Sequence, residues 1–298
     1  MKVPVGLLLT ISMIAISFSA IFVKWSDAPS TIISMNRMYL ASLLLLPIVW
    51  VNRKEFKKLS KKDWLFLCMA GVFLAMHFAL WFESLKLTTV ASSTIILSLQ
   101  PIVAMVGGFF IYKERTDLST FMAIGLSIIG VVMVGWGDFG LSSQSAIMGD
   151  ILSFLSVIAV VTYLLIGQNN VKKISHWIYS FCVFFFAGLS LNIYNLMTGV
   201  QISGYPAREW GIFLLLAIFP TLAHVIFNFL LNHVNTTTIS MSVLGEPVGA
   251  TILAILLLGE PVLPLQLIGG FIALLGVFIF LMQQKKVALK EKEKPIAS

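Results

Sequence analysis

Charged residues are scarce in this sequence, and cysteines are scarcer. Only 11% of its 298 residues are Asp, Glu, Lys or Arg, whereas 58% are hydrophobic, and the mean hydropathy is +0.97. Soluble domains carry about 25% charged residues, so this composition excludes that class and predicts an integral membrane protein. Cys68 and Cys182 stand singly without metal-site spacing, and we expect them to pack as small apolar residues. We therefore expect neither a metal site nor a cofactor.

Long polar stretches are also missing. Ten apolar runs, each close to the roughly 20 residues that cross a hydrocarbon core, fill the chain and leave only short loops. We expect an all-α integral membrane fold with ten transmembrane helices and no soluble domain, so the protein acts within or across the lipid bilayer. The expected limits are 4–25, 31–52, 64–85, 88–112, 118–136, 147–167, 176–198, 210–231, 236–258 and 263–283.

Sequence motifs of enzymes are absent as well. The chain contains no HExxH, GxSxG or Walker motif, and the acidic residues within its apolar runs are few and scattered. We therefore expect no catalytic residues and no enzyme activity. A primary pump would need a nucleotide-binding domain, and a receptor would need larger loops for its partners. These absences favour a secondary transporter, with a non-transporting membrane receptor or assembly protein as an alternative.

Lysine and arginine fall mainly on one side of the expected membrane. Cytoplasmic loops retain positive charge, so we expect a multi-pass protein of the cell (plasma) membrane with both termini cytoplasmic. The same topology explains the net charge of +7, and we expect no nucleic-acid partner. The run 4–25 exceeds the apolar core of a signal peptide, about 7–15 residues, and is expected to remain as the first helix. The inner side would receive Lys2, 53–62, Lys113, Arg115, Lys172, Lys173 and the tail, and the outer side Lys24, Lys86 and Arg208.

An internal repeat is visible when the chain is shifted on itself. An offset of 146 residues lays Pro101 on Pro247, Glu114 on Glu260 and Gly130 on Gly276, and an offset of 143 lays 6–22 on 149–165. We expect two five-helix repeats, 1–143 and 144–284, followed by a basic cytoplasmic tail, 285–298. Because five is odd, the repeats are inverted, which is a transporter architecture with its site near the midplane. Pro101 and Pro247 are expected to break their helices there, and Glu260 to be a solvated helix end.

Short motifs in matching places of the two repeats resemble a known family. They are the Gln-Pro of 100–101, "YKER" (112–115) and the two copies of "LGEP" at 244–247 and 258–261. With the ten segments, they are similar to the EamA-type family of the drug/metabolite transporter superfamily over essentially the whole chain. Arg37, in "SMNRMYL", also resembles the family pattern. The resemblance implies a secondary transporter, often an exporter of amino acids or other small metabolites, with a central cavity lined by both halves.

Polar residues inside the apolar runs are costly in a bilayer and are therefore candidate site residues. Glu246 is a proton-coupling or substrate-contacting candidate, or else a structural residue that braces the broken helix. Arg37 either meets a substrate carboxylate or pairs with Glu83. His77 and His224 match within one residue under the 146 offset and are either proton relays or packing residues. The candidate cavity residues are Arg37, His77, Trp81, Gln100, Pro101, Tyr163, His224, Asn228, Glu246 and Pro247.

The expected substrate is a small molecule. A cavity that holds both Arg37 and Glu246 would suit a zwitterion, which makes amino acids the first expectation. Proton coupling is one alternative and an uncoupled facilitator or multidrug efflux protein is another. The sequence leaves the substrate, the direction of transport, the coupling ion and a homodimeric state open.

Overall fold

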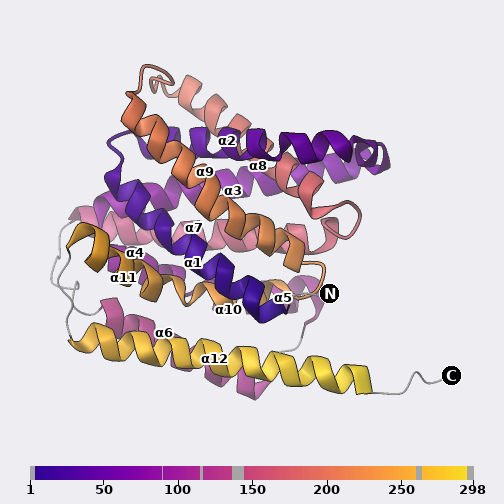
Figure 1. Ribbon diagram of the computed structural model, residues 1–298, viewed down its shortest axis with the longest axis vertical. Helices are drawn as coiled ribbons and strands as arrows, with labels where there is room; N and C mark the ends of the chain where they lie inside the picture. The colour runs from indigo at the N-terminus through magenta and orange to yellow at the C-terminus, as the bar shows by residue number, and fades with distance from the viewer. Residues whose placement is uncertain (1–3, 89, 115–116, 136–143, 260–263, 294–298) are drawn as a thin grey trace.

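The computed structural model describes residues 4–88, 90–114, 117–135, 144–259 and 264–293 (Figure 1). Within these ranges every regular element is a helix and none is a strand. The helices are α1 (Val5–Trp25), α2 (Ser30–Val51), the 3-10 helix η1 (Arg53–Lys58), α3 (Lys61–Leu87), α4 (Val90–Leu97), α5 (Gln100–Tyr112), α6 (Leu118–Gly135), α7 (Gln144–Asn170), α8 (His176–Met197), α9 (Ala207–Leu230), α10 (Thr236–Val243), α11 (Glu246–Leu258) and α12 (Pro264–Glu293). The expectation of an all-helical protein is therefore confirmed.

Seven of the described helical stretches are long and apolar enough to cross a membrane. They comprise α1, α2, α3, α8, α9, most of α7, and α10 with α11 taken together. Three further apolar helices, Gln100–Tyr112, Leu118–Gly130 and Leu267–Phe280, are shorter and fall within the remaining expected segments. By length and composition the protein is therefore a multi-pass membrane protein. The expectation that ten segments each cross the membrane remains a prediction.

Two of the expected segments are broken in the middle. The segment 88–112 divides into α4 and α5, and the segment 236–258 divides into α10 and α11. Pro101 and Pro247 each occupy the second position of the new helix, where a missing backbone N–H costs nothing. The expected helix breaks are therefore confirmed.

The two broken segments also end alike. The backbone of α5 terminates on Lys113 with φ 58°, and that of α11 on Gly259 with φ 68°, both in the left-handed region. These positions are 146 residues apart in the sequence. Glu260, which follows, lies outside the described residues.

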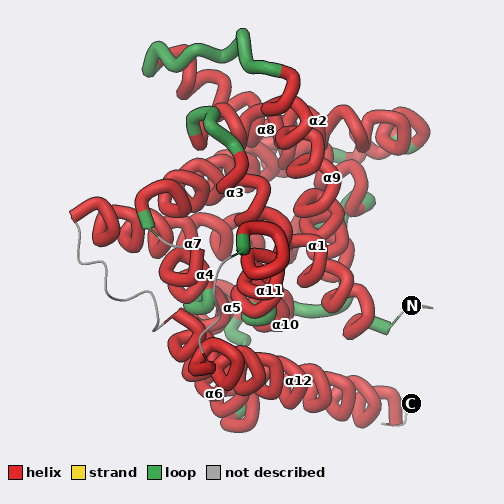
Figure 2. Tube along the Cα trace, turned by 60° about the vertical axis from the view of Figure 1, so that its left-hand side comes forward, coloured by secondary structure: helices red, strands yellow, loops and turns green. Residues whose placement is uncertain are grey.

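Most of the hydrophobic core lies between contacting helices. The helix α3 packs against α7 and α8, and α1 packs against α9. In both views α6 and α12 lie together along one edge of the bundle (Figures 1 and 2). The helix α12 continues to Glu293, beyond the expected limit of 283, because its Lys, Glu, Ala and Leu residues have high helix propensity. Part of the predicted basic tail is therefore helical.

The contact between α6 and α12 depends on glycine. A Cβ atom at Gly130 would lie 2.3 Å from the backbone nitrogen of Ala273, and one at Gly276 would lie 2.1 Å from Ser127 Oγ. Ser127 Oγ also donates a hydrogen bond of 3.2 Å to the Ala273 carbonyl. Small residues let helices approach closely in membranes, where packing rather than the hydrophobic effect holds helices together.

Candidate functional site

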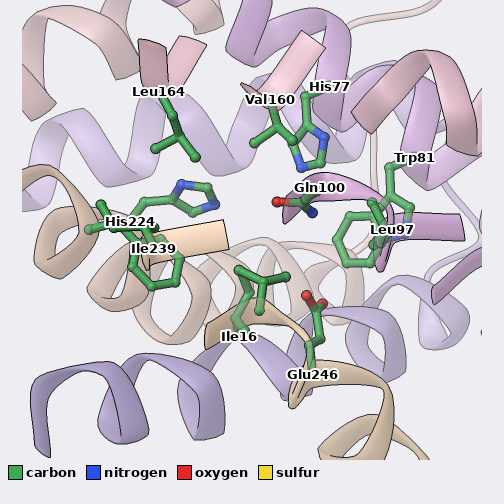
Figure 3. A pocket seen from close by; sticks show the side chains of 12 residues that line it. Ile16, His77, Trp81, Leu97, Gln100, Val160, Leu164, His224, Ile239 and Glu246 are labelled. Carbon is green, nitrogen blue, oxygen red and sulfur yellow. The ribbon is translucent and has the colours of Figure 1, made fainter. Parts of the chain in front are cut away.

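A small enclosed cavity lies at the centre of the molecule, between the two predicted repeats (Figure 3). Its volume of about 20 Å³ is enough for a water molecule and far too small for a metabolite. Figure 3 shows the polar ends of His77, Gln100, His224 and Glu246 turned toward this shared space. The lining residues are Ile16, His77, Trp81, Leu97, Gln100, Val160, Leu164, His224, Phe227, Ile239, Val243 and Glu246.

The helix α3 presents His77 and Trp81 to the cavity. The two residues are four positions apart, so they share one face of the helix, and their rings stack with centroids 5.9 Å apart. His77 Nδ1 lies 3.0 Å from the Ser156 carbonyl on α7. Because a carbonyl can only accept, Nδ1 carries the proton in this contact and Nε2 is the nitrogen left toward the cavity. The buried Trp81 Nε1 donor has no hydrogen-bond partner within the described residues.

The two helix breaks deliver Gln100 and Glu246 to the cavity. Each is the first residue of its helix, α5 or α11, and each is buried. Glu246 Oε1 accepts no hydrogen bond from any described residue. The first turn of a helix favours a carboxylate, because the free backbone N–H groups carry partial positive charge. Pro101 and Pro247, both candidates, shape the breaks and do not line the cavity.

The helix α9 contributes His224 and Phe227. His224 is buried, and neither of its ring nitrogens has a hydrogen-bond partner among the described residues. Tyr163 and Asn228, both candidates, lie outside the cavity lining. There the Tyr163 hydroxyl donates to Asn228 Oδ1, and Asn228 Nδ2 donates to Ser180 Oγ at 3.0 Å. This bonded group joins α7, α8 and α9 and holds the wall beside His224.

Arg37 is fully buried and makes no hydrogen bond to any described residue. Its guanidinium lies 3.8 Å from the centroid of the Phe78 ring, and it interacts electrostatically with Glu246 without forming a salt bridge. The alternative that Arg37 pairs with Glu83 is wrong, because no salt bridge among the described residues includes either side chain. Phe78 takes that place because an aromatic face attracts a desolvated cation.

Two polar networks at opposite ends of the bundle were not predicted from the sequence. We call the first the Glu114 network. Glu114 accepts from Gln168 Nε2 at 2.6 Å and from Asn235 Nδ2 at 3.0 Å, and Gln168 Oε1 in turn accepts from the Thr236 backbone at 2.8 Å. It ties the end of α5 to the end of α7 and the start of α10. Asn235 also caps the start of α10, because its Oδ1 accepts from the Thr238 backbone.

The second network, the Glu209 network, joins the connection between α1 and α2 to the start of α9. Glu209 accepts from the Ser26 hydroxyl and, at 3.1 Å, from the Asp27 backbone. Arg208 donates to Asp27 Oδ2 at 2.8 Å and to the Trp25 carbonyl at 2.7 Å. Sequence inspection assigned Arg208 only to the outer side. The signal that was missed is the acidic residue beside it in the first turn of α9.

The cavity therefore combines unpaired donors and acceptors with an apolar wall. A buried polar atom without a partner costs about 1–3 kcal/mol, so a water molecule or a ligand group that bonded these atoms would stabilise the site. Among the described residues no three His, Cys, Asp or Glu side chains are grouped to hold a metal. The arrangement is suited to binding a small molecule that carries both polar and apolar groups.

Comparison with known proteins identifies the family. The model of the EamA-like transporter family matches residues 4–136 and 147–282. The chain belongs to the EamA-like transporter family. It is 27% identical over 264 residues to the uncharacterized transporter YetK of Bacillus subtilis, a match that covers 84% of this chain and 78% of YetK. An uncharacterized transporter of Clostridium kluyveri is 24% identical, with 83% of this chain and 82% of that protein covered.

The fold of this EamA-like protein is also found in a solved crystal structure. The two chains superpose with a TM-score of 0.76 at 15% identity, and the match covers 95% of this chain and 98% of the other. An EamA-like protein is a membrane transporter that acts on a small molecule.

Proposed function

We propose that this EamA-like transporter exports small zwitterionic metabolites, amino acids first among them, across the cytoplasmic membrane by alternating access. The observation that carries the proposal is the central cavity, which collects unpaired polar atoms from both halves of the chain. Its apolar residues would accommodate a side chain, and its polar atoms would fix orientation. In this proposal the transporter is coupled to protons through Glu246.

Opposite charges near the cavity support a zwitterion. Glu246 lines the space, and Arg37 lies behind it over Phe78, without a hydrogen-bond partner among the described residues. A substrate ammonium would meet Glu246, and a substrate carboxylate would attract Arg37 once the cavity opens. His77 and His224 are the remaining ionisable groups of the lining, and they are candidates to pass protons to or from Glu246.

The pattern of helix contacts supports two inverted five-helix repeats of ten spans. Exchanging the repeats turns the packed pair α3–α7 into α9–α1, and both pairs are present. The pairs α2–α8 and α6–α12 map onto themselves, as contacts on a two-fold axis do. Such symmetry lets two halves exchange conformations around a site between them.

The ends of the molecule support the proposed orientation. The start of α1 and the end of α12 lie at the same end of the bundle as the Glu114 network (Figure 1). That end also carries η1, with Arg53, Lys54, Lys57 and Lys58, as cytoplasmic surfaces do. We assign it to the cytoplasm and the Glu209 network to the outside.

The test is uptake of labelled amino acids and other metabolites into proteoliposomes that contain the purified protein, with and without an imposed pH gradient. We expect substrate-specific flux that follows the proton gradient. The Glu246→Gln variant, which keeps the shape of the side chain and removes its charge, should bind substrate but lose the response to the gradient. Asp117→Asn, at an exposed position before α6, is the matched control and should behave like the wild type.

Either of two results contradicts part of the proposal. Flux that ignores both the gradient and the Glu246→Gln change indicates an uncoupled facilitator with a structural Glu246. Flux of hydrophobic cations without flux of zwitterions indicates multidrug efflux, and then Arg37 does not face substrate.

A further inference from the structure

A second and larger depression lies on the side of the bundle, away from the central cavity. It has a volume of about 480 Å³ and is formed by α2, α3, α7 and α8. We call it the lateral groove. It shares no residue with the lining of the central cavity. Its lining residues are Thr31, Val72, Ala75, Met76, Ala79, Leu80, Glu83, Leu152, Ser190, Leu191 and Tyr194.

The lateral groove has the composition of a ligand site. Volumes of about 300–1,000 Å³ with a mostly apolar lining and a few polar groups are typical of small-molecule pockets. The groove is hollow because Ala75, Ala79 and Ser190 are small where neighbouring positions carry Met76 and Leu80. It follows α3 from Val72 to Glu83, which is about 16 Å at a rise of 1.5 Å per residue.

Glu83 is the one Asp, Glu, Lys, Arg or His in the groove lining. It is exposed, although it belongs to the membrane-spanning stretch Lys61–Leu87. Within the described residues it has no hydrogen bond and no salt bridge. Lys86 interacts with it electrostatically, but the Lys86 ammonium donates to the Ala28 carbonyl instead. An ionisable residue in a membrane span is costly, and Lys86 forms no salt bridge with Glu83 within the described residues, so the carboxylate remains open to a cation that enters the groove.

We propose that the lateral groove binds an amphiphilic amine, a small molecule with one ammonium group and one apolar chain. The ammonium lies against the Glu83 carboxylate, about four residues from the end of α3 and hence near the membrane surface. The apolar chain extends along Ala79 and Met76 toward Val72, deeper in the bilayer. The Tyr194 ring, which also lines the groove, offers its face to the cation.

The charge of the lining distinguishes this ligand from a membrane phospholipid. An aminophospholipid headgroup carries a phosphate beside its ammonium. The groove lining contains no Lys, Arg or His to receive that phosphate. A ligand with a single positive charge therefore complements the groove better than a zwitterionic headgroup does.

The experiment is titration of the purified full-length protein with dodecylamine, read by native mass spectrometry, with dodecanol as the uncharged probe of equal chain length. We expect one bound amine per protein and much weaker binding of dodecanol. Glu83→Gln should weaken amine binding about fivefold, the upper range for a partly exposed charge pair. Ala79→Leu, which fills the groove and leaves Glu83 in place, should weaken both probes.

Two control variants keep the result specific. Asp27→Asn removes another exposed carboxylate at the same end of the molecule, and Glu246→Gln removes the carboxylate of the central cavity. Neither should change amine binding. The proposal is overturned if Glu83→Gln binds the amine as the wild type does, or if Glu246→Gln alone loses binding, which places the amine in the cavity. Equal displacement of the amine by phosphatidylethanolamine makes the occupant a lipid and also overturns it.

Discussion

Arg37 is the residue whose surroundings are least expected in a folded membrane protein. Its three nitrogens are buried and have no hydrogen-bond partner among the described residues. Contact with an aromatic face supplies about 2 kcal/mol or somewhat more to a desolvated cation, whereas burial of an ion costs several. We therefore expect the buried guanidinium to be costly in this conformation, and a ligand anion that reached it would lower that cost.

Replacing Arg37 by Met separates the functional role from a structural one. Because Arg37 forms no salt bridge within the described residues and an unpaired buried charge is costly, we expect the unfolding midpoint of Arg37→Met to stay or rise. Transport in proteoliposomes should be abolished. The matched variant Arg37→Lys keeps the charge and should keep part of the flux. A lower unfolding midpoint together with normal flux would assign Arg37 to the scaffold.

Among the elements, the broken helices were predictable and the networks were not. Pro101 and Pro247 have a local consequence, because a proline removes a backbone hydrogen bond inside a helix and its ring clashes with the preceding turn, whereas both costs vanish in the first turn. The partners of Glu114 are 54 and 121 residues away in the sequence, and the Ser26 partner of Glu209 is 183 residues away. Such long-range pairs depend on helix packing, which the sequence pattern does not specify. The same limit explains why one of the two alternatives for Arg37, a pair with Glu83, is not found.

The candidate site was predictable in part for the same reason. His77, Trp81, Gln100, His224 and Glu246 line the cavity, and each had been selected as a polar or aromatic residue in an apolar run. The apolar lining residues, such as Val160 and Leu164, carry no such signal because most of the chain is apolar. Their position in the cavity lining depends on how the helices pack against one another. Whether the lining binds substrate stays a prediction.

Alanine substitution at two glycines of α6 should change the free energy of unfolding in opposite directions, because only one of them lies at the crossing with α12. A Cβ at Gly130 would lie against the backbone of Gly269 and Ala273, whereas one at Gly125 would meet no atom within 4 Å. Gly130→Ala should lower the free energy of unfolding by about 1–3 kcal/mol through overpacking. Gly125→Ala should raise it by about 0.5–1 kcal/mol through helix propensity. Thermal or denaturant unfolding in detergent measures both, and equal effects would contradict the packing argument.

At the scale of the whole molecule, the two networks lie at opposite ends of the bundle. The Glu114 network joins three helices at one end, and the Glu209 network joins the α1–α2 connection to α9 at the other. The central cavity, about 20 Å³, shares no residue with either network. In the proposed alternating-access cycle, we expect one network to open while the other holds.

Matched variants of the two glutamates test this expectation. Glu114→Gln turns one acceptor oxygen into an amide donor that faces the Asn235 or Gln168 amide, and hydrogen bonds to a charged group are worth about 1.5–3 kcal/mol. We expect Glu114→Gln to speed maleimide labelling of an Ile239→Cys reporter in the cavity from the cytoplasmic side. Glu209→Gln should speed it from the outside. If both variants speed labelling from the same side, the two networks do not each control access from their own end of the bundle.

The symmetry of the α6–α12 crossing has a further consequence for the proposed cycle. The contact of Gly130 with Ala273 and the contact of Gly276 with Ser127 are the same contact under the 146-residue offset. If the two inverted halves trade conformations in the proposed cycle, each of these contacts takes the place of the other, so both states keep a close crossing at this point. Mutations there should therefore destabilise the inward-open and outward-open states together rather than favour one of them.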